Sequence, residues 1–250
     1  LLGLISFVYY LNKYFNKFFF KKDLIFLVVV FLILFCSVLI AKNHDDFPYY
    51  HFSYTYNLTQ DALNFGIGKF NHGFRTPSSI FYLNSLFYLP GIDYYFLNGG
   101  AILILGFSNL YLVNQLLKKL KINNIDFIFY VLLLSLALIN SSFYRISEHG
   151  TDRSSLILIF LFSTIYLQSI NLNHNILKKN FTNFYEKLII ILGLIVSFKS
   201  FYLIYSIFLL TWFFELKNIV IRKNILSISI LKNYITYLFI LLIGLILITM

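Results

Sequence analysis

Two adjacent carboxylates, Asp45 and Asp46, follow a long apolar run of the chain, and His44 precedes them. Neighbouring carboxylates repel each other, which raises the pKa of one of them unless a cation compensates. Such a carboxylate can act as a general base, and its oxygens also suit a divalent metal ion. Acidic residues beyond a helix end are common, so an ordinary surface position remains an alternative. We expect a base at Asp45 or Asp46.

A second polar cluster lies between two later apolar runs. It contains Arg145, Glu148, His149, Asp152 and Arg153. The planar guanidinium of arginine fits phosphate oxygens better than any other side chain. We therefore expect this turn to bind the phosphate of a lipid. Asp152 has a simpler explanation, because an acid in the first turn of the next helix is stabilised by the helix dipole.

Three further residues carry charge or can do so. Lys199 interrupts an apolar region, and an ionisable side chain inside a membrane segment is by default a functional candidate. Its expected partner is an anionic group in an outer cavity. Arg75 and His72 flank Gly73, which permits a tight turn, and the two side chains could bind an anion. Ordinary loop chemistry explains Arg75 and His72 equally well.

The sequence predicts no metal centre or cofactor beyond the possible divalent ion at Asp45 and Asp46. Histidines at short metal-ligand spacing, such as HExxH, are absent from the sequence. The single cysteine, Cys36, lies inside an apolar run and excludes disulfides within the chain.

The composition is that of a membrane protein. Hydrophobic residues make up 59% of the 250 residues and charged residues 12%, whereas soluble domains carry about 25% charged residues. After a first stub at 1–11, the apolar regions are Leu24–Ala41, Phe96–Val113, Ile125–Ser141, Ser155–Ile170, Leu188–Phe214 and Tyr234–Met250. We expect an all-α, polytopic transmembrane helix bundle, a single domain over 1–250, truncated at both ends.

The basic residues predict an orientation. The net charge of +10 does not indicate nucleic acid, because 14 of the 20 Lys and Arg residues cluster in four short segments between apolar regions. The outer loop 42–95 and the outer turn 142–154 together hold only five. Loops rich in lysine and arginine stay in the cytoplasm. The polar clusters are therefore expected on the periplasmic or exterior face of a bacterial inner membrane.

The region 188–214 has basic residues on both sides, so both of its ends are expected in the cytoplasm. We interpret it as a hairpin of two short helices with Lys199 near the tip. The alternative is one long tilted helix in which Lys199 extends its amine to the membrane surface.

The outer loop 42–95 contains 15 Phe and Tyr residues. Such side chains favour the headgroup region, so we expect the loop to lie along the membrane surface. Within it, Ser78–Leu89 is predicted as a short interfacial helix, capped by Ser78 or Ser79 and ended by Pro90-Gly91.

The acidic pair after an apolar helix resembles the GT-C superfamily of membrane glycosyltransferases. Gly193–Lys199 looks like the G-x-x-x-[ST]-x-K stretch of many bacterial members. The runs DDFPYYHFSYTYNLT, GIGKFNHGFRTPSSIFYLNSLFYLP and SEHGTDRSS are similar to a family of bacterial multi-spanning membrane proteins over roughly residues 40–215.

The GT-C resemblance implies inverting transfer of a sugar from a polyprenyl-phosphate-linked donor within the lipid bilayer. Asp45 or Asp46 would take the proton of the acceptor, and Arg145, Arg153, Lys199 and Arg75 would hold the donor phosphate. Two other functions remain open: a transporter or flippase of lipid-linked saccharides, and a polysaccharide polymerase or ligase of another membrane fold.

The charge pattern gives a testable topology. Cysteine labelling should place positions near 60 and 148 outside and positions near 120, 180 and 220 inside, because basic segments are retained in the cytoplasm. Labelling of position 220 from the outside would contradict the hairpin.

Overall fold

The computed structural model describes residues 9, 21–40, 45–61, 66–75, 78–89, 91–141, 147, 150–170 and 174–209. Within these residues the regular elements are helices, apart from an isolated bridge between Leu89 and Asp93. The all-α class is therefore confirmed. The predicted region Tyr234–Met250 lies outside the described residues, as does the N-terminal stub except Tyr9.

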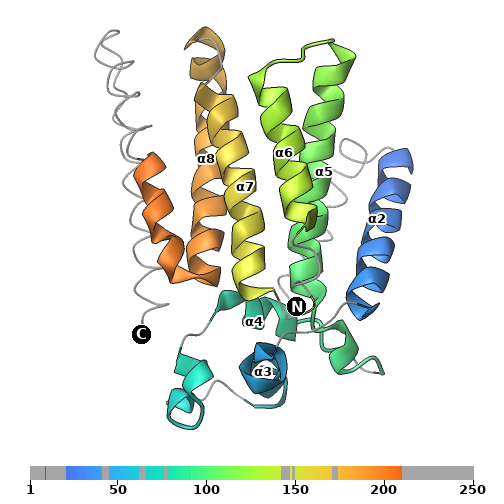
Figure 1. Cartoon of the computed structure of the whole chain (residues 1–250), viewed down its shortest axis with the longest axis vertical. Coiled ribbons are helices and arrows are strands. Elements are labelled where there is room, and N and C mark those ends of the chain that lie inside the picture. Colours follow the sequence, from blue (N-terminus) through green and yellow to red (C-terminus); the bar gives the residue numbers. More distant parts are fainter. Residues whose placement is uncertain are drawn as a thin grey trace.

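Long helices with roughly aligned axes form the body of the structure (Figure 1). They are α2 (Lys21–Ile40), α5 (Gly99–Lys121), α6 (Phe127–Ser141), α7 (Thr151–Ile170) and α8 (His174–Phe198). Helix α7 packs against α8, α6 and α5, and α2 packs against α5. Short connections between successive helices make α5, α6, α7 and α8 antiparallel neighbours.

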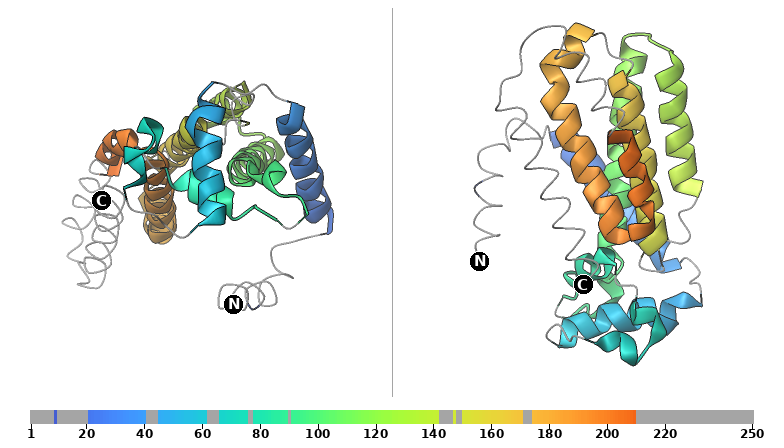
Figure 2. Two further views of the ribbon diagram at one scale, coloured as in Figure 1. Left: turned by 90° about the horizontal axis from the view of Figure 1, so that it is seen from below. Right: turned by 90° about the vertical axis from the view of Figure 1, so that its left-hand side faces the viewer.

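Shorter elements gather at one end of these helices, which we call the α4 end (Figure 2). They are η1 (Phe47–His51), α3 (Phe52–Gln60), η2 (Ile67–Lys69), η3 (His72–Arg75), α4 (Ser79–Ser85) and η4 (Tyr94–Phe96). A further short helix, η6 (Ser200–Ser206), follows α8 and packs beside it.

One continuous helical run in the described part of the chain is long and apolar enough to cross a membrane. It covers Tyr94–Lys121, 28 residues with a mean hydropathy of 1.6. At 1.5 Å per residue it is about 42 Å long, against about 30 Å for the hydrocarbon core of a bilayer. Shorter apolar helices are Ile25–Cys36, Phe127–Ser141, Lys187–Phe198 and Ser200–Leu209.

The helix limits differ from the apolar regions where charged residues flank them. Helix α5 continues through Lys118 to Lys121, which the sequence pattern assigned to a connecting segment. Cations in the last turn are stabilised by the helix dipole. Helix α8 begins at His174, well before the apolar region that starts at Leu188, and no Gly or Pro between them stops the helix. Hydropathy indicates which residues favour an apolar medium, but it does not show where a helix begins or ends.

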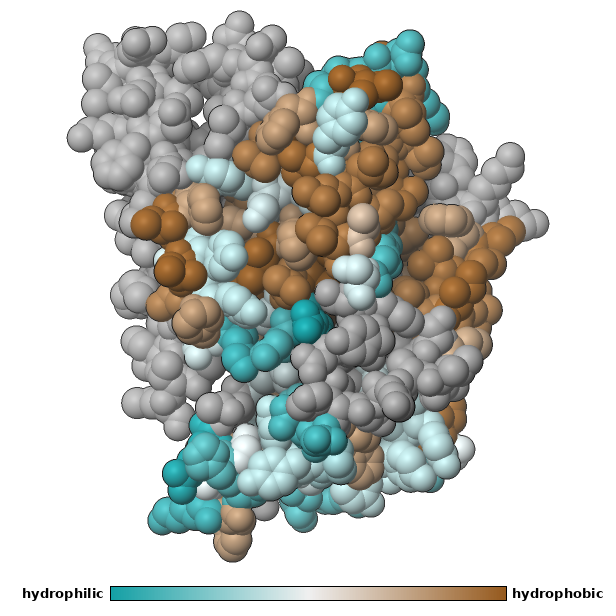
Figure 3. Space-filling model, viewed as in Figure 1, coloured by the Kyte–Doolittle hydropathy of each residue, from teal (hydrophilic) through white to brown (hydrophobic). Residues whose placement is uncertain are grey.

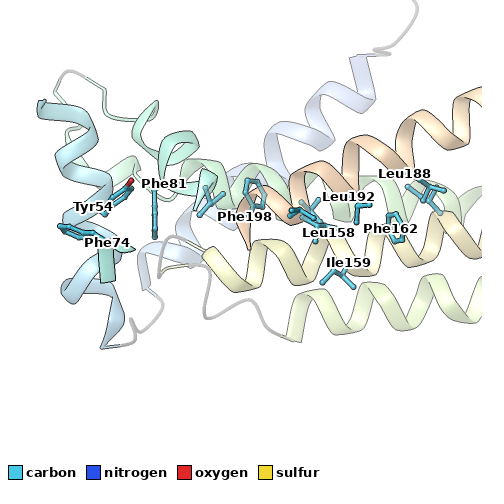
Figure 4. Packing of buried hydrophobic residues seen from close by; sticks show 13 residues of the cluster. Tyr54, Phe74, Phe81, Leu158, Ile159, Phe162, Leu188, Leu192 and Phe198 are labelled. Atoms are coloured by element: carbon cyan, nitrogen blue, oxygen red, sulfur yellow. The ribbon is translucent and has the colours of Figure 1, made fainter. Parts of the chain in front are cut away.

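The apolar core runs from the long helices into the α4 end without a gap. Phe162 of α7 and Leu192 of α8 are buried in the same cluster as Phe81 of α4 and Tyr54 of α3 (Figure 4). Phe198, the last residue of α8, lies in this cluster as well. The aromatic segment that includes α3 and α4 is therefore packed, through α4, onto the ends of α7 and α8.

Glycines allow the closest approaches to α5. A Cβ at Gly106 would lie 2.5 Å from the ring of Phe31, one of the α2 residues that pack against the core of α5. A Cβ at Gly100 would lie 2.5 Å from the Asn84 side chain of α4. Small residues at such points let elements pack backbone to side chain without a void.

Side-chain hydrogen bonds also connect the long helices. The pairs are Asn109–Asn140 between α5 and α6, Ser135–Thr164 between α6 and α7, and Tyr111–Gln168 between α5 and α7. The two asparagines exchange bonds of 3.1 and 2.7 Å. Each pair joins side chains of two different helices and so helps to fix their register.

At the end opposite α4, Asp126 joins α5 to α6. One of its oxygens accepts the Phe129 N–H at 3.0 Å, which caps α6, and Lys119 of α5 donates at 2.6–2.7 Å. The hydrogen bond from Lys119 holds the pKa of Asp126 below its ordinary value.

This lowered pKa gives a pH-dependent stability. The contribution is complete above the unfolded pKa of about 3.9 and is lost as the pH falls through the folded value. We expect Asp126→Asn to lower the free energy of unfolding at pH 7 by about 0.5–1 kcal/mol and to flatten its pH dependence below pH 4. Thermal unfolding in detergent measures both effects. The control is Lys118→Ala, and an equal melting temperature for wild type and Asp126→Asn contradicts the prediction.

Candidate functional site

The candidate site lies where α8 ends. Lys199 has extended backbone angles, φ −150° and ψ 106°, directly after the last helical residue, Phe198. The chain then returns beside α7, because the ring of Phe208 packs against Phe162 at 6.3 Å and Tyr166 at 5.2 Å. Lys199 therefore occupies the tip of a reversal. The arm before it is α8, a helix of 25 residues, and not the short helix from Leu188 that the sequence predicted, while 210–214 lie outside the described residues.

The amine of Lys199 forms an ion pair of 2.7 Å with Asp152. Asp152 lies in the first turn of α7, where the helix dipole stabilises a negative charge. The side chains of Lys199 and Asp152 are 46% and 57% exposed. Because water screens such a pair, its net strength is small and a second anion can compete for the amine.

Two further side chains lie near this ion pair. The hydroxyl of Tyr202, on η6, lies within the electrostatic field of Asp152, Lys199 and Arg153. Arg153 is half-buried next to Asp152 on α7. The structure thus brings together three residues predicted separately, from the outer turn and from the apolar region 188–214, and adds a phenol.

A hydrogen bond from α4 fixes this end of α8. The buried hydroxyl of Ser78 donates to the carbonyl of Phe198 at 2.6 Å. The last carbonyls of a helix lack intrahelical partners, and Ser78 satisfies one of them. Ser78 is the N-cap residue of α4, one of the two predicted, but its hydroxyl bonds Phe198 and makes no capping bond to α4. Helix α4, Ser79–Ser85, is also shorter than the predicted Ser78–Leu89.

The start of α7 is fixed by Gly150. Its φ of +70° is rarely adopted by residues with a side chain, and a Cβ there would lie 2.7 Å from Ala101 of α5. The Gly150 carbonyl accepts the first bond of α7, from the Ser154 N–H at 2.8 Å. Gly150 therefore sets the height of Asp152 against α5, a role that the sequence pattern did not predict.

The acidic pair lies at the same end of the molecule. Asp45 is exposed, and half-buried Asp46 immediately precedes η1 at the α4 end. In the described part of the chain, no three His, Cys, Asp or Glu side chains gather in a way that could hold a metal ion. The pair thus shares an end of the bundle with Lys199, and its part in chemistry stays a prediction.

The loop of His72 and Arg75 is organised by bonds of its own. Arg75 donates to the Gly68 carbonyl at 3.1 Å, and Asn71 donates to the Tyr49 carbonyl at 3.1 Å. A Cβ at Gly73 would lie 2.5 Å from Tyr50. Gly73 lies in a tight turn, as expected, since the Phe74 N–H donates to the Asn71 carbonyl at 3.0 Å, and it also permits close packing against η1. These contacts favour the structural interpretation of the loop, while His72 and Arg75 remain exposed.

Four predicted site residues lie outside the described residues: His44, Arg145, Glu148 and His149. Ser78, Gly150 and Tyr202 belong to the site but were not predicted. For Ser78 and Gly150, the sequence offered only their positions as a clue to a role in the site: Ser78 follows a proline, and Gly150 lies inside the polar turn.

Comparison of the chain with protein-family profiles, with curated proteins and with solved structures gives no match.

The contact between Ser78 and Phe198 gives the next prediction. We expect Ser78→Ala to lower the free energy of unfolding by about 1–3 kcal/mol, because the Phe198 carbonyl is left buried without this donor. Ser79→Ala is the matched control, since it removes a neighbouring hydroxyl from the same segment. Melting temperatures in detergent compare the two variants, and equal losses would refute a specific role for Ser78.

Proposed function

We propose that the chain is a multi-pass membrane protein that transfers a sugar from a polyprenyl-phosphate-linked donor at the α4 end, on the outer face of a bacterial plasma membrane. The observation that carries the proposal is the Lys199–Asp152 ion pair, with Arg153 beside it, at the reversal after α8.

The membrane part of the proposal draws on the exposed apolar side chains. On α2 and α6 they include Val28, Leu32, Tyr130, Leu133 and Leu134. Figure 3 shows apolar side chains over the middle of the long helices and polar ones toward their ends. Apolar surfaces of this extent mark a membrane or protein contact. Lys118 and Lys121 lie at the end opposite Asp152, which suits a cytoplasmic position for that end.

The proposed chemistry needs few groups. Lys199 and Arg153 bind the donor phosphate, which replaces Asp152 as the partner of the lysine amine. The acceptor hydroxyl attacks the anomeric carbon as the bond from that carbon to the phosphate oxygen breaks. The phosphate leaves with the electron pair, stabilised by the two cations. Asp45 or Asp46 takes the proton of the hydroxyl, and the configuration at the anomeric carbon is inverted.

A second candidate is a transporter of the same lipid-linked saccharide. The interruption of α8 at Lys199 favours it, because discontinuous helices with polar groups at the break form substrate sites in transporters. In that case the same cations would hold the headgroup without any bond being broken.

Replacement of the acidic pair tests the catalytic proposal. We expect Asp45→Asn or Asp46→Asn to reduce sugar transfer by about 10²-fold or more, since the amide has no basic oxygen. Binding of the donor should persist in the affected variant, because Lys199 and Arg153 are unchanged. The measurement is transfer of a labelled sugar from a polyprenyl-phosphate donor by purified protein in nanodiscs.

Asp61→Asn is the matched control, because Asp61 is an exposed aspartate after α3. Wild-type transfer in both Asp45→Asn and Asp46→Asn would refute the glycosyltransferase. Movement of the labelled lipid across sealed vesicles, with no transfer by the wild-type protein, would establish the transporter instead.

A further inference from the structure

The turn that connects α4 to α5 presents apolar side chains outward. Leu86 is 74% exposed and Tyr95 59% exposed. We call this connection between α4 and α5 the interfacial turn. The apolar side chains that it presents outward are Leu86, Leu89, Ile92, Tyr94 and Tyr95. These five side chains carry no charge, and the hydroxyls of the two tyrosines are hydrogen-bonded to each other at 3.2 Å. The exposed carboxylate of Asp93 lies between Ile92 and Tyr94 in the same turn.

The inner side of this turn is firmly packed. The ring of Phe87 lies against Gly99, where a Cβ would be only 2.4 Å from it, and Leu97 is fully buried. Asn84, the residue before Ser85 at the end of α4, accepts the Ala101 N–H at 3.3 Å. The turn is thus held to the first residues of α5, and its outward apolar side chains project from a well-packed backbone.

The backbone of the turn is largely self-satisfied. The N–H groups of Ile92 and Asp93 both donate to the Leu89 carbonyl, at 3.1 and 2.9 Å. Tyr95 N–H donates to the Ile92 carbonyl at 3.3 Å. Positive φ angles at Gly91 and Asp93 make this compact path possible. Backbone that enters a lipid environment must satisfy its polar groups internally, and this turn does so for these groups.

The turn also stands at the right place on α5. The membrane-length helical run begins at Tyr94, inside the turn itself. Tyrosines at the end of a spanning helix settle at the headgroup level, with the ring in the acyl boundary and the hydroxyl toward water. The outward apolar and aromatic side chains of the turn therefore match the chemistry of a lipid interface.

We propose that the interfacial turn inserts into the boundary between headgroups and acyl chains, with bilayer lipid as its partner. The inference rests on the proposed membrane location and is independent of sugar transfer. Helix α4 is about 10 Å long, and at its other end Ser78 bonds the residue before Lys199. Insertion of the turn would thus hold the Lys199–Asp152 pair at the depth of lipid phosphates.

Tryptophan fluorescence in lipid vesicles tests the proposal. The chain has one tryptophan, Trp212, which is first replaced by phenylalanine. Single tryptophans are then introduced as Tyr95→Trp in the turn, Asn124→Trp in the exposed polar connection between α5 and α6, and Phe107→Trp on the exposed face of α5. Lipids brominated near the headgroup or near the chain end, and aqueous iodide, serve as quenchers.

We expect Tyr95→Trp to be quenched by the shallow bromolipid, to show blue-shifted emission and to resist iodide. Phe107→Trp should be quenched by the deep bromolipid. Iodide quenching of Tyr95→Trp equal to that of the water-facing Asn124→Trp, with Phe107→Trp still deeply quenched, would overturn the inference alone and indicate a water-facing surface. Loss of bromolipid quenching at both Tyr95→Trp and Phe107→Trp would overturn the membrane location as well.

Discussion

The end of α8 at Phe198 is the constraint on which the α4 end of the molecule depends. A helix that stops inside a packed assembly leaves carbonyl groups that need donors, and Ser78 supplies one from the start of α4. The next residue, Lys199, turns the chain and directs its amine to Asp152 of α7. One backbone interruption therefore joins α4, α7, α8 and η6 and exposes a cation where they meet.

The surroundings of this joint are rigid, whereas the ion pair itself is open to exchange. Phe198, Phe162 and Phe81 are almost fully buried in one continuous cluster, so the backbone around Lys199 has little freedom. The charged ends of Lys199 and Asp152 remain about half exposed. A fixed backbone with a solvated charge suits the binding of an incoming anion, since little ordering is required and the existing partner is weakly held.

Polar groups elsewhere in the long helices follow a different rule. Asn109 and Asn140 satisfy each other, as do Ser135 and Thr164, so these groups hold helices together. Close packing at Gly106 does the same between α2 and α5. Polar side chains within the bundle bond each other and hold helices together, whereas the Lys199–Asp152 ion pair at its end is exposed to water. This difference distinguishes structural polar residues from those of the candidate site.

The sequence by itself determined the helical class, and it placed α2, α6 and α7 within four residues of their observed limits, because apolar runs of this length form helices in an apolar surrounding. It also located the break after α8 at Lys199, because a charged residue divides the apolar region 188–214 into two runs. Only the tertiary structure decided that Asp152 is the partner of Lys199, that Ser78 bonds Phe198, and that Gly73 accommodates Tyr50. Ser78 and Phe198 are 120 residues apart in the chain, and such contacts depend on how helices pack, which no local pattern of residues encodes.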